Sequence, residues 1–227
     1  MALQSRKEFI LASLAVPSIL AGAAVAGTGP QPKTLLDLEQ QRPKPSNLSK
    51  SVLIVIDAQN EYRRGPLMLD GIEPAIRRLA TLLQRARAAG TPIIHIAQTG
   101  DPGDMFDRKG ERGQFVSEAT PQEGETVIEK PLPDSFARTP LQDRLIALGR
   151  KDLVVAGFMT HMCVSSTVRA ASDLDYGITV AADATATRAL PGALDGRALA
   201  AAQVQACALA ALADYFAAIA SSDAIPA

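Results

Sequence analysis

Cys163, one of only two cysteines in the chain, lies where a predicted strand gives way to a predicted helix. The strand covers Leu153 to Gly157, Thr160 is a typical helix N-cap, and apolar residues then recur at helical spacing. In the first turn of a helix, unpaired backbone N–H groups and the helix dipole stabilise a thiolate. The spacing therefore predicts a nucleophilic cysteine, and a buried structural cysteine is the competing interpretation.

Two charged side chains follow other predicted strands in the same way. Asp57 ends the strand in SVLIVID, and Lys130 ends the strand in TVIEK. Taken singly, an aspartate after a strand is often a turn residue, and a lysine there is usually solvated. The carboxyl ends of parallel strands meet at one edge of a sheet, so Asp57, Lys130 and Cys163 converge there. Their convergence favours catalysis, with a carboxylate base and an ammonium group beside a sulfur nucleophile.

Alternating strands and helices must position these groups. From residue 51 onward, runs of β-branched residues alternate with amphipathic stretches, which predicts one α/β domain with a parallel sheet covered by helices on both faces. Two polar stretches, 98–125 and 185–196, are long enough to cover a site. The predicted strands are 51–57, 91–97, 126–130, 152–157 and 178–183 with a short edge strand at 222–225, and the predicted helices are 72–89, 141–148, 162–175 and 195–218.

The composition argues against several classes of function. The 227 residues carry a net charge of −1 and are 47% hydrophobic, so we expect a core-forming domain and neither nucleic acid nor an acidic membrane as partner. Two cysteines are too few for a zinc framework, and a disulfide scaffold is unusual in a domain with this much core. Cys207 falls on an Ala-rich helical face, where we predict an inert core thiol that forms no disulfide with Cys163.

The N-terminus has the organisation of a cleavable signal peptide. Arg6 and Lys7 precede an Ala-rich apolar stretch that ends in AVA, a small-residue cleavage pattern. SRKEFI resembles the twin-arginine export motif, and a disordered or anchoring N-terminal helix is the alternative. We predict a leader at 1–26, a linker at 27–49 and a domain at 50–227. The expected location is the periplasm or the medium, with no membrane partner once the leader is removed.

The segments that carry the three candidate residues resemble the isochorismatase-like cysteine hydrolase superfamily. The matching stretches are SVLIVIDAQNEY, GETVIEK and VVAGFMTHMCVSSTVRAASDLDYG with VAADATATR. The resemblance implies a three-layer, doubly wound, Rossmann-like α/β fold with a six-stranded, mostly parallel sheet. It implies Asp57, Lys130 and Cys163 as a catalytic triad, a cis peptide between Phe158 and Met159, and an oxyanion hole made by the backbone N–H groups of Met159 and Cys163. Relatives are often dimers or tetramers, which implies a homo-oligomer.

The chemistry implied by the resemblance is hydrolysis of a small amide or related C–N bond through a thioester. Asp57 accepts the thiol proton, the sulfur attacks the acyl carbon, and protonated Asp57 then serves the leaving amine. One alternative is vinyl-ether hydrolysis of the isochorismate type, whose enzymes generally lack the cysteine. Another is a catalytically silent binding protein that keeps the fold, which the intact set of three residues disfavours.

The histidines do not support a metal or a histidine base. Nicotinamidases of the superfamily carry an Asp/His metal cluster after the second strand, whereas this chain has no histidine past His95 in that stretch. We therefore expect no metal and no other cofactor. Gln98 stands where close relatives often have histidine, so the substrate of a relative should not be transferred to this chain. His95 lies inside a strand, where a satisfied core role is favoured. His161 cannot easily face a sulfur two residues away on the same helix, and we place it at the pocket mouth.

Polar and apolar side chains near the triad are candidates for binding a small-molecule substrate. The Gln59 amide either orients Asp57 or the substrate, or caps the following turn. Aromatic and methionine side chains form the expected apolar wall. The predicted substrate-binding residues are Gln59, Tyr62, Gln98, Phe106, Phe136, His161 and Met162.

Overall fold

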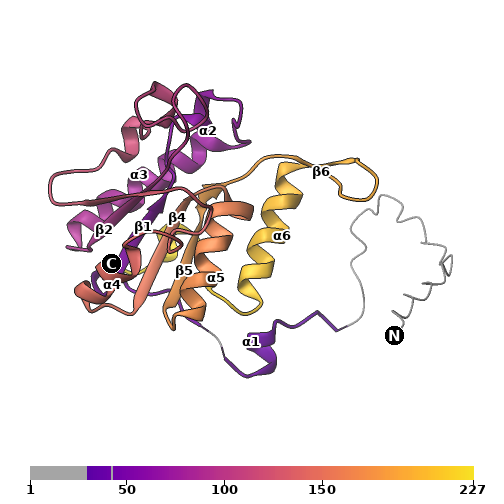
Figure 1. Ribbon diagram of the computed structural model, residues 1–227. Helices are drawn as coiled ribbons and strands as arrows, with labels where there is room; N and C mark the ends of the chain where they lie inside the picture. The colour runs from indigo at the N-terminus through magenta and orange to yellow at the C-terminus, as the bar shows by residue number, and fades with distance from the viewer. Residues whose placement is uncertain (1–29, 42) are drawn as a thin grey trace, which may run out of the picture. The chain divides into compact units, whose positions relative to one another are not determined.

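A computed structural model describes residues 30–41 and 43–227, so the predicted leader at 1–26 lies outside the described residues. The unit from Lys33 to Ala227 is built on a parallel six-stranded sheet in the order β3-β2-β1-β4-β5-β8 (Figure 1). The predicted six-stranded α/β fold is thereby confirmed. The strands are β1 (Ser51–Ile56), β2 (Ile93–Gln98), β3 (Thr126–Lys130), β4 (Asp152–Phe158), β5 (Gly177–Ala186) and β8 (Ala218–Ala220).

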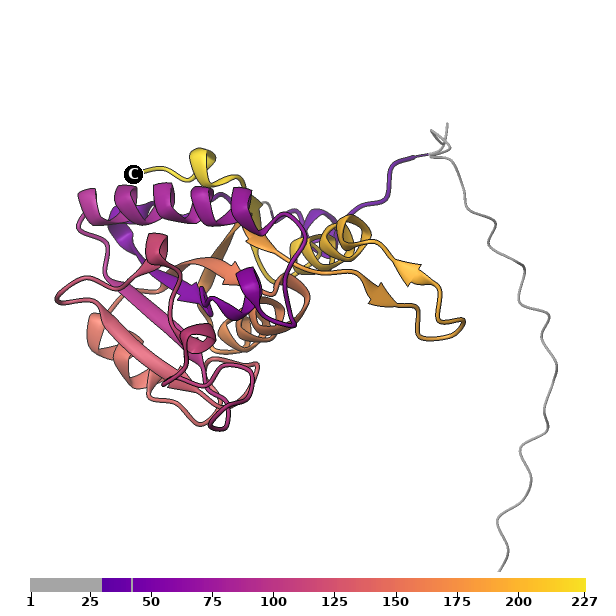
Figure 2. The ribbon, with the colours of Figure 1, turned by 90° about the horizontal axis from the view of Figure 1, so that it is seen from above.

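Helices cover both faces of this sheet, and for that reason every residue of β1 is buried. Leu53 and Val55 join the core on the face of α3, whereas Ile54 and Ile56 join the core on the opposite face. Successive side chains of a strand thus belong to opposite cores, and the unbroken apolar run in β1 follows from this. Figure 2 shows helices on both sides of the sheet. The main helices are α3 (Ile72–Ala88) on the first face and α4 (Leu141–Leu148), α5 (Ser165–Asp173) and α6 (Ala201–Ala213) on the second.

The order of strands reverses between β1 and β4. The chain adds β2 and β3 on one side of β1, and then returns to add β4, β5 and β8 on the other side. At such a reversal the connections leave in opposite directions and open a crevice beyond the carboxyl ends of the two central strands. Asp57 directly follows β1, and the turn that contains Cys163 directly follows β4. The topology therefore places both residues at this crevice.

Several predicted elements begin and end where the sequence indicated. β3 and α4 have the predicted bounds, and α3 ends one residue earlier than predicted. Gly149 closes α4 in the left-handed conformation, with φ 65°, and its N–H donates to the carbonyls of Leu145 and Ile146. The predicted helix at 162–175 differs, because a π-helical turn, Thr160–Val164, precedes the α-helical part.

The C-terminal region differs most from the prediction. The helix predicted at 195–218 is shorter, because a hairpin of β6 (Leu190–Pro191) and β7 (Ala198–Leu199) precedes α6. Gly196, with φ 69°, allows the hairpin to turn. The edge strand predicted at 222–225 is wrong: β8 is the edge strand, and Ser222–Ala224 is a 3₁₀ turn.

The segment before β1, assigned to a linker at 27–49, packs on the domain from Lys33 onward. The short helix α1 (Leu35–Leu38) buries Leu36, whose N–H donates to the carbonyl of Asp214 at 3.1 Å. Leu48 is fully buried, and its N–H donates to the carbonyl of Pro226 at 2.9 Å. Within the described residues, no helix combines the length and the apolarity that crossing a membrane requires.

Candidate active site

Asp57 is held at the end of β1 in a backbone conformation that is uncommon for residues other than glycine. Its φ is 47°, in the left-handed region that aspartate tolerates better than most residues. Its N–H still pairs with the carbonyl of Ile96 at 3.0 Å, so the residue is fixed to β2 while the chain turns. The side chain is fully buried. Such residues concentrate at functional sites, where the surrounding structure holds the backbone in place.

Lys130 reaches Asp57 from two strands away. Its Nζ lies 2.8 Å from Asp57 Oδ2, and neither side chain has exposed surface. Since β2 lies between β1 and β3, only a long side chain can span the distance. The same Nζ donates to Gln98 Oε1 at 2.6 Å and to the carbonyl of Leu132 at 3.1 Å. With three oxygen atoms around it, the ammonium group is a fixed positive charge next to the carboxylate.

Close packing between β4 and β1 brings the cysteine turn next to Asp57. Gly157 has φ 115°, and a Cβ atom there would lie 2.0 Å from the carbonyl oxygen of Ile56. The position therefore admits only glycine. The peptide between Phe158 and Met159 is cis, as the resemblance implies. In the turn that follows, the N–H of Val164 donates to the carbonyl of Met159 at 3.2 Å.

The turn Thr160–Val164 divides its side chains between the interior and the surface. Cys163 is 5% exposed, and Thr160 is fully buried. Thr160 was predicted as an N-cap, but its Oγ1 instead donates to the carbonyl of Ala186 at 3.0 Å, which ties the turn to the end of β5. Met162 is 40% exposed, and its place in the apolar wall of the site stays a prediction.

The protonation of Cys163 follows from its burial. Burial and the charge of Asp57 raise the pKa of the Cys163 thiol to about 12, and Lys130 opposes them only in part. Burial and Asp57 thus oppose the stabilisation of a thiolate that the first turn of a helix provides. Burial also raises the pKa of Asp57, against the lowering effect of Lys130, so its carboxylate is a stronger base than a solvated aspartate. The site at rest pairs a thiol with a base.

Tyr62 packs against Phe106 and lies beside Asp57 and Cys163. The ring centroids of Tyr62 and Phe106 lie 5.3 Å apart, and Tyr62 also contacts Phe158 edge-on at 6.0 Å. Burial raises the pKa of the Tyr62 phenol well above its ordinary value, and the neighbouring charges of Asp57 and Cys163 raise it further. Tyr62 therefore presents a protonated hydroxyl group near the sulfur.

The side chains of Gln59 and Gln98 form hydrogen bonds that hold neighbouring segments and Lys130 in place. Gln59 is fully buried, and its Nε2 donates to the carbonyls of Gln98 and Gly113 at 3.0 and 2.8 Å. Its Oε1 accepts from the N–H of Gln98 at 2.9 Å. Gln59 thus fastens the loop 98–125 to the end of β2, which neither of the two interpretations of this residue had proposed. Gln98 uses its Oε1 to hold Lys130, as described above.

Two other predicted substrate-binding residues, Phe136 and His161, contact side chains other than Asp57, Lys130 and Cys163. Phe136 stacks on Tyr176 with ring centroids 6.3 Å apart, and Tyr176 directly precedes β5, at the amino ends of the strands. A role for Phe136 in binding substrate stays a prediction. The His161 ring bonds through Nδ1 to Thr187 Oγ1, and burial lowers its pKa, as does the nearby Arg188.

The remaining histidine and cysteine occupy other surroundings. His95 is buried in β2, and its Nε2 lies 2.8 Å from Glu125 Oε2, in keeping with the core role predicted for it. Cys207 is free and exposed, so the prediction that it lies in the core is wrong, whereas Cys163 is free and buried. Among residues 30–41 and 43–227, no three His, Cys, Asp or Glu side chains are grouped so that they could hold a metal ion.

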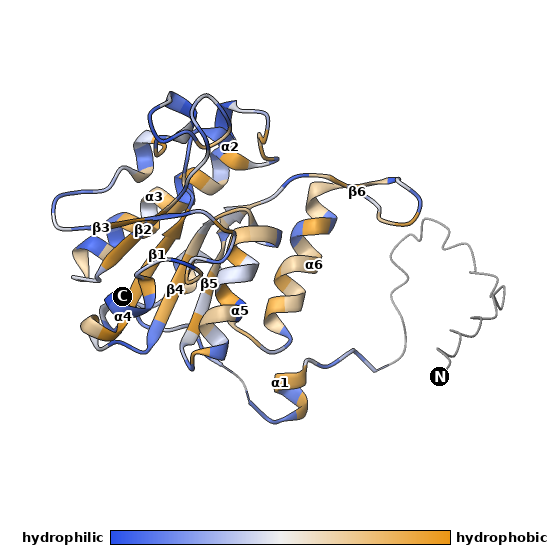
Figure 3. Cartoon of the chain, in the orientation of Figure 1, coloured by the Kyte–Doolittle hydropathy of each residue, from blue (hydrophilic) through white to orange (hydrophobic). Residues whose placement is uncertain are grey.

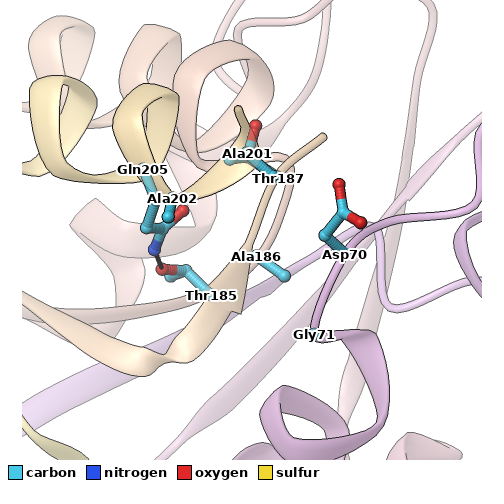
Figure 4. A pocket seen from close by; sticks show the side chains of 8 residues that line it. All are labelled: Asp70, Gly71, Thr185, Ala186, Thr187, Ala201, Ala202 and Gln205. Carbon is cyan, nitrogen blue, oxygen red and sulfur yellow. Dashed lines mark hydrogen bonds between the residues drawn. The ribbon is translucent and has the colours of Figure 1, made fainter. Parts of the chain in front are cut away.

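Some contributors to this region had no signal in the sequence. Leu132 accepts a hydrogen bond from Lys130 through its backbone carbonyl, and every residue type has such a carbonyl, so the sequence could not predict this contact. Thr187 and Arg188 belong to the segment VAADATATR, which carried part of the resemblance, but no role had been assigned to either residue. A pocket of about 310 Å³ lies at the end of β5, where Thr185, Ala186 and Thr187 form part of its lining (Figure 4). In it, Gln205 Nε2 donates to Thr185 Oγ1 at 2.9 Å, while the buried Gln205 Oε1 has no partner within the described residues.

Comparisons with known proteins agree with this architecture. An isochorismatase-domain family profile matches residues 51–224. The secreted isochorismatase effector Isc1 of Verticillium dahliae is 38% identical over 181 residues, 79% of this chain and 92% of the effector. The ureidoacrylate amidohydrolase RutB of Klebsiella pneumoniae is 34% identical over 182 residues, 63% of this chain and 77% of RutB. The crystal structure of an isochorismatase from Pseudomonas putida KT2440 superposes with a TM-score of 0.82 at 45% identity, covering 86% of this chain and all of that one.

Proposed function

Since the chain belongs to the isochorismatase family of hydrolases, we propose that it cleaves a small amide or a related C–N bond, with Cys163 as nucleophile and a thioester intermediate. The observation that carries the proposal is the buried contact of Asp57 with Lys130, 2.8 Å apart, next to a buried thiol. Acyl transfer to a cysteine requires a base, a cation and a sulfur nucleophile close together in a site shielded from water.

In the first step, Asp57 takes the proton from the Cys163 thiol as the sulfur attacks the acyl carbon. Lys130 Nζ lies 2.8 Å from Asp57 Oδ2, and the Cys163 thiol is within hydrogen-bonding reach of the same carboxylate, so the thiol proton can pass directly to Asp57. The raised pKa of Asp57 favours the transfer. The backbone N–H groups of Met159 and Cys163 donate hydrogen bonds to the acyl oxygen and stabilise the negative charge that develops on it.

In the second step, the tetrahedral intermediate collapses, and protonated Asp57 gives its proton to the leaving nitrogen. The amine or ammonia departs, and the acyl group remains on the sulfur as a thioester. Asp57, again a carboxylate, then removes a proton from water, which attacks the thioester. When this intermediate collapses, Asp57 returns the proton to the departing sulfur, so that the acid and the thiol are released. Lys130 remains an ammonium group throughout and stabilises Asp57 in its charged form.

The relatives support this class of substrate. RutB is a ureidoacrylate amidohydrolase, and a Streptomyces noursei relative, 33% identical over 141 residues, is a streptothricin hydrolase. A screen of small amides, ureido and carbamoyl compounds and nicotinamide for released ammonia tests the proposal, with Cys163→Ala as the control. Release of ammonia by the wild type and not by Cys163→Ala supports it. No hydrolysis across the set, or equal hydrolysis by both proteins, would contradict it.

We also propose that the protein is exported and that its leader is removed. The organisation of residues 1–26 and the similarity to a secreted effector support this proposal. N-terminal sequencing of the protein recovered from the periplasm or medium tests it, since cleavage near Ala26 is expected and an intact Met1 would contradict removal.

A further inference from the structure

The phenol of Tyr62 has no part in the proposed reaction, although it lies beside the sulfur. Tyr62 belongs to α2 (Glu61–Arg64), the short helix that follows Asp57 in the chain. Figure 3 shows the strands of the sheet in hydrophobic colours and the loops around α2 in mostly hydrophilic colours. Tyr62 is nevertheless only 1% exposed, so its hydroxyl group depends on the protein for a hydrogen-bond partner.

Two aromatic neighbours fix the position of the Tyr62 ring. The ring meets Phe106 at an interplanar angle of 64° and Phe158 at 69°, and both contacts are edge-on. Phe158 ends β4, and the turn that carries Cys163 comes after it in the chain. The packing of Tyr62 on Phe158 therefore holds the phenol in a constant position relative to this turn.

The hydrogen-bonding neighbour of the Tyr62 hydroxyl is the sulfur of Cys163. A buried tyrosine hydroxyl ordinarily finds a partner, as that of Tyr176 does by donating to Gln142 Oε1 at 3.2 Å. Among residues 30–41 and 43–227, no nitrogen or oxygen atom pairs with the Tyr62 hydroxyl, whereas the sulfur lies within its hydrogen-bonding reach. The sulfur can thus give its proton to Asp57 while it accepts a hydrogen bond from Tyr62.

The phenol keeps its proton in these surroundings. Burial and the charges of Asp57 and Cys163 hold the pKa of Tyr62 well above its ordinary value, as described above. Loss of the phenol proton would place a second buried negative charge beside Asp57. Tyr62 is therefore a hydrogen-bond donor at this site, and neither an acid nor a base.

We propose that Tyr62 is a further catalytic residue, whose hydroxyl group donates a hydrogen bond to the sulfur of Cys163 when the sulfur carries negative charge. The charge develops twice, first as Asp57 removes the thiol proton and again as the sulfur leaves the acyl group. A hydrogen bond to a charged atom is stronger than one to a neutral atom, so the contact stabilises the thiolate more than the thiol. No bond to the tyrosine oxygen forms or breaks. The inference rests on the proposed function, because it adds a group to the Cys163 nucleophile.

Alkylation of Cys163 by iodoacetamide tests this contact without any substrate. In a Cys207→Ser background Cys163 is the remaining cysteine, and at about pH 9 the rate is proportional to its small thiolate fraction. Tyr62→Phe removes one oxygen atom and keeps the ring, and we expect it to slow alkylation about tenfold. The matched control is Tyr215→Phe, since Tyr215 is 49% exposed and its loss of a hydroxyl should leave the rate unchanged. An equal or faster rate in Tyr62→Phe would overturn the proposal.

The same change in an Asp57→Asn background shows which atom the hydroxyl contacts. A hydrogen bond to the sulfur persists when the carboxylate is gone, so Tyr62→Phe should again slow alkylation about tenfold. If the effect of Tyr62→Phe disappears in this background, the hydroxyl acts on the carboxylate and the proposal is wrong.

Hydrolysis of a substrate found by the amide screen gives the second readout. Tyr62→Phe should lower kcat and kcat/KM equally, by about tenfold, because the hydroxyl acts on a charge that develops only during the reaction. A raised KM with an unchanged kcat would assign Tyr62 to substrate binding alone and would contradict the proposal. Because alkylation needs no substrate, slow labelling of Tyr62→Phe supports the hydrogen bond even if the screen contradicts the proposed hydrolysis.

Discussion

Lys130 Nζ lies 2.8 Å from Asp57 Oδ2, and both side chains are fully buried. A buried ion pair is costly to break from one side only, because the charge left behind loses both its partner and water. The pair is therefore a constraint on folding as well as a part of the candidate active site.

Removing one member of this pair should cost more stability than removing both. We expect Lys130→Met to lower the free energy of unfolding by about 3–5 kcal/mol, since it leaves Asp57 buried and unpaired. The double variant Asp57→Asn with Lys130→Met should be more stable than the Lys130→Met single variant. Urea unfolding measures both. If the double variant loses the sum of the two single losses, the charges are not coupled as described.

The thiol of Cys163 should react slowly with iodoacetamide at neutral pH. Its pKa of about 12 leaves almost no thiolate at pH 7, and the rate should rise steadily with pH. Asp57→Asn removes a charge that raises this pKa, so it should speed alkylation while it slows hydrolysis. The measurement belongs in a Cys207→Ser background, because Cys207 is exposed. Fast labelling of the wild type at pH 7 would show that the thiolate is present at rest.

Gln98 should affect catalysis through Lys130. Its Oε1 accepts from Lys130 Nζ at 2.6 Å, so Gln98→Ala should lower kcat/KM by about tenfold by freeing the ammonium group. Gln98→Glu adds a second negative charge and should raise the pKa of Asp57, which moves the acidic limb of the pH profile to higher pH. The exposed Gln41→Ala serves as control. An unshifted limb in Gln98→Glu would rule out this role.

Gly157 should be far less tolerant of alanine than another glycine with a similar backbone. Gly124 has φ 86°, and a Cβ atom added there would have no neighbour within 4 Å, so Gly124→Ala should cost only about 1–2 kcal/mol. At Gly157 the same change adds a contact of 2.0 Å with the Ile56 carbonyl and should cost at least about 2 kcal/mol more. Comparable unfolding free energies for the two variants would mean that β4 and β1 can separate easily.

Glu125 should make stability depend on acid pH. Burial raises its pKa, but Arg87, the Gln122 N–H and His95 outweigh burial and hold it at about 2, below the ordinary 4.5. A carboxylate with a lowered folded-state pKa stabilises the protein above about pH 4.5 and loses that contribution as pH falls toward 2. The difference in unfolding free energy between wild type and Glu125→Gln should shrink over this range. A difference that stays constant with pH would contradict it.

The fold and the three central residues could be predicted because they follow from local patterns. The unbroken apolar run in β1 predicts a strand buried on both faces, and the glycine after α4 predicts the end of that helix. Polar residues at strand ends mark the edge of the sheet where a site can form. The carboxyl edge of the sheet then gathers Asp57, Lys130 and Cys163 without further information.

The parts that were mispredicted, or that could not be predicted, depend on contacts between distant segments. The protonation of Cys163 is set by burial and by Asp57, which a helix start alone does not reveal. Cys207 is exposed because of how α6 packs, and the edge strand is Ala218–Ala220 because these residues pair with β5. The role of Gln59 depends on the course of the loop 98–125, which its polar, glycine-rich sequence does not determine.

Intact-mass analysis of the enzyme quenched during turnover of an amide substrate tests the proposed chemistry most directly. We expect an adduct with the mass of the acyl group, mapped to Cys163 and absent from Cys163→Ala, which should also be inactive. Wild-type turnover by Cys163→Ala would show that the sulfur is not the nucleophile.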